Sequence, residues 1–243
     1  MLGACIGDII GSVYEFNAWK SLEFPLFGEK SEFTDDTVCT IAVAECLLDG
    51  SDPAAGLRKW CHRYPGRGYG GSFAVWLRDA GMGPYNSYGN GAAMRVSPAA
   101  WLARSLDEAL ALARHVTAVS HNHPEGIKGA EATVTAIWLA RQNETPEAIR
   151  RWIHEAFDYD LTRSVDEIRP HYRFNETCQD TVPQAIVCAL EAASFEDAIR
   201  NAVSLGGDAD TLAAIAGPIA EVRFGIPEEI RRKGLLRLPK DMR

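Results

Sequence analysis

Apolar residues recur at helical spacing along most of the chain. Two clear examples are "GAEATVTAIWLARQ" (residues 129–142) and "TVPQAIVCALEAA" (residues 181–193). Helix start signals, in which a capping hydroxyl is followed by proline or an acidic residue, stand at Ser97, Ser105, Thr145 and Ser194. Only "LEFPLF" (residues 22–27) has the alternation of a strand. The pattern predicts an all-α domain of roughly ten helices, with long loops in its first half.

The segment "DADTLAAIAGPIAEV" (residues 208–222) is apolar on nearly every side. Such a helix has no face suited to water, so we expect it at the centre of the molecule. Pro218 lies within it and should either kink the helix or end it early.

The composition predicts a single domain, residues 1–243, because no linker rich in proline, glycine, serine or charged residues divides the chain. Hydrophobic residues make up 47% of the chain, enough for a sizeable core. The net charge of -8 argues against binding nucleic acid by phosphate neutralisation. The one basic stretch, residues 231–240, is interpreted as a solvated helix end.

The amino-terminal run "MLGACIGDIIGSVYEF" has no basic start, and Asp8 and Glu15 interrupt it, which argues against a signal peptide and against a membrane span. None of the six cysteines has zinc-site spacing, and most have apolar neighbours. We therefore expect reduced core thiols, a cytoplasmic location and a monomer.

Two pairs of aspartates are the strongest candidates for chemistry. Asp35 and Asp36 lie in "FTDDT", and Asp208 and Asp210 lie in "GGDADT". One interpretation is structural: Thr34 caps a helix whose first turn favours negative charge. The other is a metal site, because four converging carboxylates repel unless cations balance them. Oxygen ligands without cysteine or histidine favour Mg²⁺, Mn²⁺ or Ca²⁺. The residues alone leave both interpretations open.

Three further stretches carry polar groups that could have either a structural or a ligand-binding role. "PGRGYGGSF" (residues 65–73) and "PYNSYGNGAAMR" (residues 84–95) are glycine-rich loops that could bind phosphate through backbone N–H groups or simply be turns. "SHNHPEG" holds His121 and His123, for which capping or substrate contact is favoured over metal binding. Asp8 is interpreted as a structural acceptor of backbone N–H groups.

Together, "GACIGDIIGSVYE", "FTDDT", "RGYGGS", "SYGNGAAMRVSP", "SHNHPEGIKGA" and "GGDADTLAAIAGPIAE" resemble the motifs of the ADP-ribosylglycohydrolase (ADP-ribosyl-acceptor hydrolase) family, which includes dinitrogenase-reductase-activating glycohydrolase. They occur in the family's order and cover nearly the whole chain. The resemblance implies a compact single-domain orthogonal helical bundle with two Mg²⁺ ions, or Mn²⁺, in a cleft for ADP-ribose. The metal ligands it implies are Thr34, Asp35, Asp36, Asp208, Asp210 and Thr211.

The resemblance also assigns the loops. The residues implied to contact ADP-ribose are Gly68, Gly70, Gly71, Ser87, Tyr88, Gly89, Asn90, Gly91 and His121, with Tyr88 at the adenosine end and His121 at the diphosphate. Glu15 matches a gating glutamate found in relatives that act on serine-linked ADP-ribose.

The function implied is metal-dependent hydrolysis at the C1″ carbon of ADP-ribose carried by a protein. Asp36, or alternatively Asp35 or Asp210, would accept the proton from water, and Glu15 is a candidate to protonate the leaving group. The acceptor, arginine or serine, is not assigned by the resemblance. The alternatives are a hydrolase of another ADP-ribose derivative, such as O-acetyl-ADP-ribose, and a non-catalytic ADP-ribose binder or crystallin-like structural protein.

Overall fold

The computed structural model describes all 243 residues, and every regular element in it is helical. The α-helices are α1 (Leu2–Gly11), α2 (Asp35–Asp49), α3 (Pro53–Arg63), α4 (Gly71–Arg78), α5 (Ser97–Leu102), α6 (Leu106–Thr117), α7 (Pro124–Arg141), α8 (Pro146–Phe157), α9 (Val165–Ile168), α10 (Cys178–Glu191), α11 (Phe195–Ser204), α12 (Ala209–Phe224) and α13 (Glu228–Leu235). Two short 3₁₀ helices, η1 (Asn90–Ala92) and η2 (Lys240–Met242), complete the set. The prediction of an all-α fold is confirmed.

Most of the expected helix starts are found. Ser105, Thr145 and Ser194 each accept a hydrogen bond from the backbone N–H three residues later, at 3.1, 3.2 and 3.1 Å. Ser97 is not a cap, because α5 already includes it and Val96 takes the capping position.

Residues 22–27, the one segment with the alternation of a strand, form an irregular loop. Two of its backbone carbonyl groups accept hydrogen bonds from a side chain and not from a neighbouring strand. The guanidinium of Arg200 donates to the carbonyl oxygens of Leu22 at 2.8 Å and Phe24 at 2.9 Å. The Phe24 ring also packs on Tyr14, with ring centroids 4.9 Å apart.

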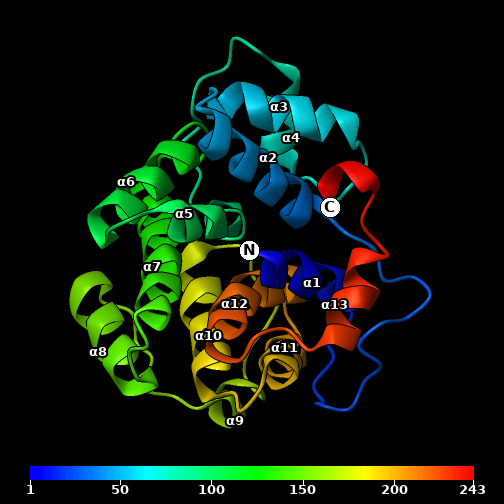
Figure 1. The fold of residues 1–243 in the computed structure, drawn as a ribbon, viewed down its shortest axis with the longest axis vertical. Helices are drawn as coiled ribbons and strands as arrows, with labels where there is room; N and C mark the ends of the chain where they lie inside the picture. Colours follow the sequence, from blue (N-terminus) through cyan, green and yellow to red (C-terminus); the bar gives the residue numbers. More distant parts are fainter.

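Helix α12 lies at the centre of the bundle, as its sequence predicts. It contacts α1, α7, α10 and α11 (Figure 1), and every residue from Ala209 to Ala220 is buried. The helix continues past Pro218 to Phe224, so of the two expected outcomes, a kink or an early end, the early end does not occur. We attribute this to the packing on all sides, which offsets the hydrogen bond that proline cannot donate.

Helices α1 and α12 pack antiparallel and unusually close together. Both present small residues at four-residue spacing: Gly3, Gly7 and Gly11 on α1, and Ala209, Ala213 and Gly217 on α12. A Cβ atom added to Gly3 would lie 2.5 Å from the carbonyl oxygen of Gly217, and one added to Gly11 would lie 2.5 Å from that of Ala209. This contact sets the end of α1 beside the start of α12, where the second aspartate pair lies.

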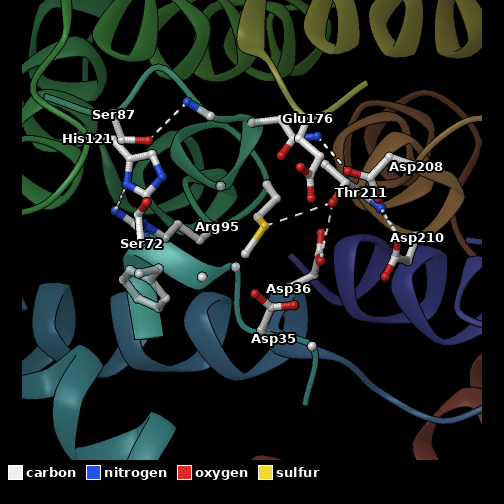
Figure 2. A pocket seen from close by; sticks show the side chains of 18 of the residues that line it. Asp35, Asp36, Ser72, Ser87, Arg95, His121, Glu176, Asp208, Asp210 and Thr211 are labelled. Atoms are coloured by element: carbon white, nitrogen blue, oxygen red, sulfur yellow. Dashed lines mark hydrogen bonds between the residues drawn. The ribbon is translucent and has the colours of Figure 1, made fainter. Parts of the chain in front are cut away.

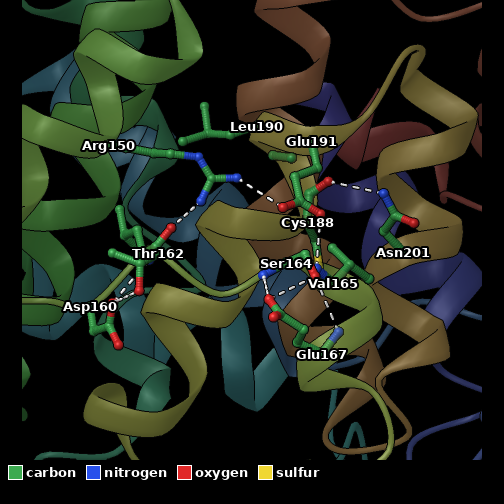
Figure 3. Close-up of polar contacts among 12 residues, drawn as sticks. Arg150, Asp160, Thr162, Ser164, Val165, Glu167, Cys188, Leu190, Glu191 and Asn201 are labelled. Atoms are coloured by element: carbon green, nitrogen blue, oxygen red, sulfur yellow. Dashed lines mark hydrogen bonds and ion pairs between the residues drawn. The ribbon is translucent and has the colours of Figure 1, made fainter.

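Polar contacts fix the segment between α8 and α10 (Figure 3). Arg150 of α8 donates to the carbonyl oxygen of Leu161 and forms an ion pair with Glu191 at 3.2 Å. The other carboxylate oxygen of Glu191 accepts from the N–H of Val165 at 2.8 Å. A capping box of Ser164 and Glu167 starts α9. These contacts tie α8 and α9 to the carboxyl end of α10, and the opposite end of α10 faces the site.

One hydrophobic cluster of 65 buried residues extends from Cys5 to Met242. All six cysteines are buried and free, as expected of core thiols. No helix has both the length and the apolar content needed to cross a membrane.

Candidate active site

The two aspartate pairs meet where α2 and α12 begin (Figure 2). Asp35 and Asp36 occupy the first turn of α2, whereas Asp208 precedes α12 and Asp210 lies in its first turn. The Thr211 hydroxyl lies 3.4 Å from a carboxylate oxygen of Asp36, which joins the two groups. Both helix dipoles place their positive ends here, which favours negative charge.

Asp8 on α1 holds the start of α2 in place. Its buried carboxylate accepts from the backbone N–H groups of Thr34 at 2.9 Å and Thr37 at 3.0 Å, and from both threonine hydroxyls. Burial raises the pKa of Asp8 to about 6, although these hydrogen bonds oppose the shift. The structural interpretation of Asp8 is confirmed. Thr34 occupies the N-cap position of α2, but its hydroxyl bonds to Asp8 and not to the helix, so the side-chain cap of the structural interpretation is not formed.

When the carboxyl groups around Thr34 are ionised, the oxygen atoms there lack enough protons to bond with one another. The single hydroxyl proton of Thr34 is donated to Asp8 at 2.7 Å, yet its oxygen also lies 3.3 Å from carboxylate oxygens of Asp36 and of Asp210. The other carboxylate oxygen of Asp36 is buried without any hydrogen-bond partner. Burial is the largest cause that raises the pKa values of Asp36 and Asp210, followed by repulsion from neighbouring aspartates. A cluster of carboxylate and hydroxyl oxygens alone fits hard divalent cations.

Asp208 is linked to a glycine-rich loop. One of its oxygens accepts from the Asn90 side chain at 2.7 Å, and burial raises its pKa to about 6. The backbone N–H of Asn90 in turn donates to the carbonyl oxygen of Glu176 at 2.7 Å. The loop of residues 84–95 is thereby fixed against both α12 and the start of α10.

The other glycine-rich loop leads into α4 beside Asp35. Gly68 has a φ of +94°, a conformation that other residues rarely adopt, and a Cβ there would lie 3.4 Å from an Asp35 oxygen. The carbonyl oxygen of Arg67 accepts from the N–H of Asp35 at 2.7 Å. Gly70 and Gly71 face open space, and no side chain caps the start of α4.

These elements line a pocket of about 220 Å³ that is partly open to solvent. The acidic cluster lies at one end, and His121, Arg95 and Ser72 lie at the other (Figure 2). Only three of its 20 lining residues are hydrophobic, so the pocket suits a polar ligand. The lining consists of Glu15, Asp35, Asp36, Gly68, Gly70, Gly71, Ser72, Phe73, Tyr85, Ser87, Gly89, Asn90, Gly91, Met94, Arg95, His121, Glu176, Asp208, Asp210 and Thr211.

Comparison with known families decides what kind of protein has this pocket. The family model described as ADP-ribosylglycohydrolase matches residues 1–241. The chain belongs to the ADP-ribosylglycohydrolase family. By class it is therefore an enzyme, an ADP-ribosyl hydrolase.

Several members of this family are similar over most of their length. The zebrafish (Danio rerio) ADP-ribosylhydrolase ARH3 is 26% identical, over 93% of this chain and 82% of its own. The ADP-ribosylarginine hydrolase Tri1 of Pseudomonas putida is 25% identical, over 93% of this chain and 70% of its own. A solved structure described as an ADP-ribosylglycohydrolase-related protein complex superposes with a TM-score of 0.73 at 26% identity, covering 96% of this chain and 95% of that one.

Most of the site residues named from the sequence of this ADP-ribosylglycohydrolase line the one pocket. Thr34 lies just outside, in a smaller adjoining pocket that also includes Glu15 and Gly68. Tyr88 is not part of the lining: it is exposed and packs against His123, with ring centroids 5.1 Å apart. His123 caps α7 by accepting from the N–H of Glu125, as favoured for one of the two histidines.

Sequence reasoning missed several lining residues of this ADP-ribosylglycohydrolase. Phe73 and Tyr85 flank His121, at ring-centroid distances of 6.2 and 5.7 Å. Arg95 is fully buried. Its signal in the sequence is a single cation within the apolar stretch "AAMRVSPAAW". Glu176 has no comparable signal, because only the fold brings the start of α10 to the pocket.

Proposed function

We propose that this ADP-ribosylglycohydrolase removes ADP-ribose from modified protein side chains by metal-dependent hydrolysis at the C1″ carbon of the ribose. The observation that carries the proposal is the divided pocket. One end gathers carboxylates and hydroxyls from the starts of α2 and α12, and the other is lined by glycine-rich loops and His121.

The residues that would hold two Mg²⁺ ions, or Mn²⁺, are Thr34, Asp35, Asp36, Asp208, Asp210 and Thr211. The unpartnered oxygen of Asp36 and the proton-poor contacts of Thr34 support this assignment. When bound, such ions would polarise ribose hydroxyls and lower the pKa of a bound water.

The remaining chemistry belongs to the carboxyl groups of the chain. Asp36, with Asp35 or Asp210 as the alternative, would accept the proton of the attacking water. Burial, and then repulsion from Asp210, raise the pKa of Glu15 to about 8. In the cation-free protein this pKa favours the protonated carboxyl group at neutral pH, the form that would donate a proton to the departing acceptor.

The other end of the pocket would take the diphosphate and adenosine. Backbone N–H groups of Gly70, Gly71 and Gly91 and the side chains of Ser87 and His121 are suited to phosphate oxygens. Tyr88, outside the lining but exposed nearby, would contact the adenosine at the rim.

Protein-linked ADP-ribose is favoured over free derivatives because one relative is named an ADP-ribosylarginine hydrolase. The test is a panel of arginine-linked and serine-linked ADP-ribosylated peptides together with O-acetyl-ADP-ribose, incubated with and without EDTA. Released ADP-ribose is measured by mass spectrometry. We expect release from at least one peptide, and no release with EDTA until Mg²⁺ or Mn²⁺ is restored.

The matched variant replaces Asp35 and Asp36 with asparagine together. We expect it to lose peptide turnover while it keeps its helical circular dichroism. Undiminished turnover by this variant, or turnover that EDTA leaves intact, would contradict the proposal. Release from O-acetyl-ADP-ribose alone would move the activity to the alternative substrate class.

A further inference from the structure

The two ring nitrogens of His121 face different surroundings. A Cβ atom added to Gly91 would lie 3.1 Å from Nε2, so this nitrogen points at the loop of residues 84–95 that lines the pocket. The other nitrogen, Nδ1, lies 2.9 Å from the hydroxyl of Ser120. His121 is 5% exposed, so its hydrogen-bond partners within the protein, and not solvent, determine which ring nitrogen carries the proton.

Arg95 is a buried cation without a carboxylate partner. It is 0% exposed and forms no ion pair. Its Nη2 donates to the Ser120 hydroxyl at 2.7 Å and lies 3.4 Å from Nδ1 of His121. A guanidinium can only donate, so the Ser120 oxygen accepts from Arg95, and the same Nη2 also faces Nδ1 as a donor. A proton on Nδ1 would oppose that donor, and Nδ1 is the remaining hydrogen-bond partner of the Ser120 hydroxyl, so the arrangement favours Ser120 donating to an unprotonated Nδ1.

We infer that Arg95 and Ser120 are positioning residues that hold His121 as a neutral imidazole with its proton on Nε2, so that Nε2–H donates a hydrogen bond to an anionic ligand oxygen in the pocket. The identity of that oxygen rests on the proposed function, which makes it a phosphate oxygen of ADP-ribose. With Nδ1 accepting from Ser120 and Nε2 carrying the proton, neither ring nitrogen has a free lone pair, so His121 in this form would neither bind a metal nor act as a base.

Protonation of His121 would place an N–H at Nδ1 opposite the donors of Arg95. Burial and then the charge of Arg95 lower the pKa of His121 well below its usual range. The other titratable group that faces the ring is Tyr85, whose phenol stays neutral because burial raises its pKa to about 12. Ligand affinity should therefore show no histidine step between about pH 5.5 and 7.5.

The test is long-range ¹H–¹⁵N NMR of protein labelled at its six histidines, which reports the tautomer of each ring. The His121 signals are assigned by their loss in H121Q. We expect the Nε2–H form in the wild type throughout this pH range. Ser120→Ala should let the proton exchange between the two nitrogens and weaken ADP-ribose binding about tenfold by calorimetry. The control is Thr117→Val, which removes a buried hydroxyl that has no hydrogen-bond partner. It should change neither the tautomer of His121 nor the affinity for ADP-ribose.

Arg95 is tested by the pH profile. In Arg95→Met, His121 should titrate near the ordinary imidazole pKa, so that ADP-ribose affinity becomes pH-dependent, whereas Arg95→Lys should retain the flat profile. If Arg95→Met does not fold, Ser120→Ala tests the same chain of hydrogen bonds. A wild-type proton on Nδ1, or an unchanged tautomer in Ser120→Ala, would overturn the inference. The Nε2–H tautomer in a protein that does not bind ADP-ribose would uphold the ring assignment and contradict the proposed function instead.

Discussion

The hydroxyl of Thr34 makes the acidic cluster a connected set of oxygens. It donates to Asp8 and approaches carboxylates of both aspartate pairs, one on α2 and one on α12. Replacing this hydroxyl by a methyl group would remove one oxygen from the cluster and one donor from Asp8. The proposed metal-ligand role of Thr34 and the capping interpretation thus concern the same oxygen atom.

Glu15 offers a test of the leaving-group step at single-residue scale. With Glu15→Gln, kcat for a peptide-linked substrate should fall by about 10² to 10⁴, the usual contribution of a general acid. O-acetyl-ADP-ribose should be affected far less, because acetate leaves without protonation. Steady-state kinetics on both substrates make the comparison.

Glu32→Gln is the matched control for Glu15→Gln. Glu32 belongs to the same adjoining pocket as Glu15 but forms an exposed ion pair with Arg67. Its loss should leave both rates nearly unchanged. Equal losses on both substrates in Glu15→Gln would show that Glu15 does not act as the acid.

Residue types, read from the sequence, predict the acidic end of the site well and the opposite end poorly. The charges of Asp35, Asp36, Asp208 and Asp210 would repel if the two pairs converged, so the residue types alone offer a metal site as one of two interpretations, and the fold shows that the pairs meet. Arg95 and Glu176 gain their roles only from neighbours that packing supplies. The spacing of residues along the chain does not predict which residues pack beside Arg95 and Glu176.

At the scale of elements, helix starts were predictable where one side chain bonds to its own helix, as at Ser105. Helical spacing also located most of α7 and α10. The local pattern is a poor guide where a distant residue decides the conformation. Arg200 satisfies the carbonyls of residues 22–27, and packing around α12 overrides Pro218.

The close contact of α1 and α12 makes a prediction about Gly7. Alanine normally stabilises a helix relative to glycine by up to about 1 kcal/mol. Here a Cβ would overlap the carbonyl group of Ala213, so Gly7→Ala should instead destabilise the fold by about 1 to 3 kcal/mol. Urea unfolding measures the change.

Gly83→Ala is the control, because a Cβ there meets nothing within 4 Å. It should stay within about 0.5 kcal/mol of the wild type. A Gly7→Ala protein as stable as this control would mean that the two helices can separate at little cost.

At the scale of the whole molecule, the buried carboxylates couple stability to pH and to cations. Burial raises the pKa values of Asp8 and Asp208 to about 6 and that of Glu15 to about 8. The folded chain therefore binds more protons than the unfolded chain between about pH 4 and 8, and the stability of cation-free protein should fall as pH rises through this window.

Bound divalent cations should remove most of that dependence, since they favour the ionised carboxylates. Thermal unfolding at pH 5 and pH 8, with EDTA or with Mg²⁺, measures the effect. We expect the melting temperature to drop between these pH values in EDTA and to stay level or rise in Mg²⁺. The same pH response in both conditions would argue against cation binding at the cluster.

The pairing of α1 with α12 also bears on how the protein is made. A ribosome completes α1 first and α12 only after more than eight-tenths of the chain. Until then Gly3, Gly7 and Gly11 of α1 have no helix to pack against, and Asp210 is not yet present beside Asp8 and Asp36. Contacts so far apart in sequence form late and close a long loop. A nascent chain thus contains Asp35 and Asp36 long before α12 supplies Asp210, so the proposed cation site is complete only when most of the chain has been made.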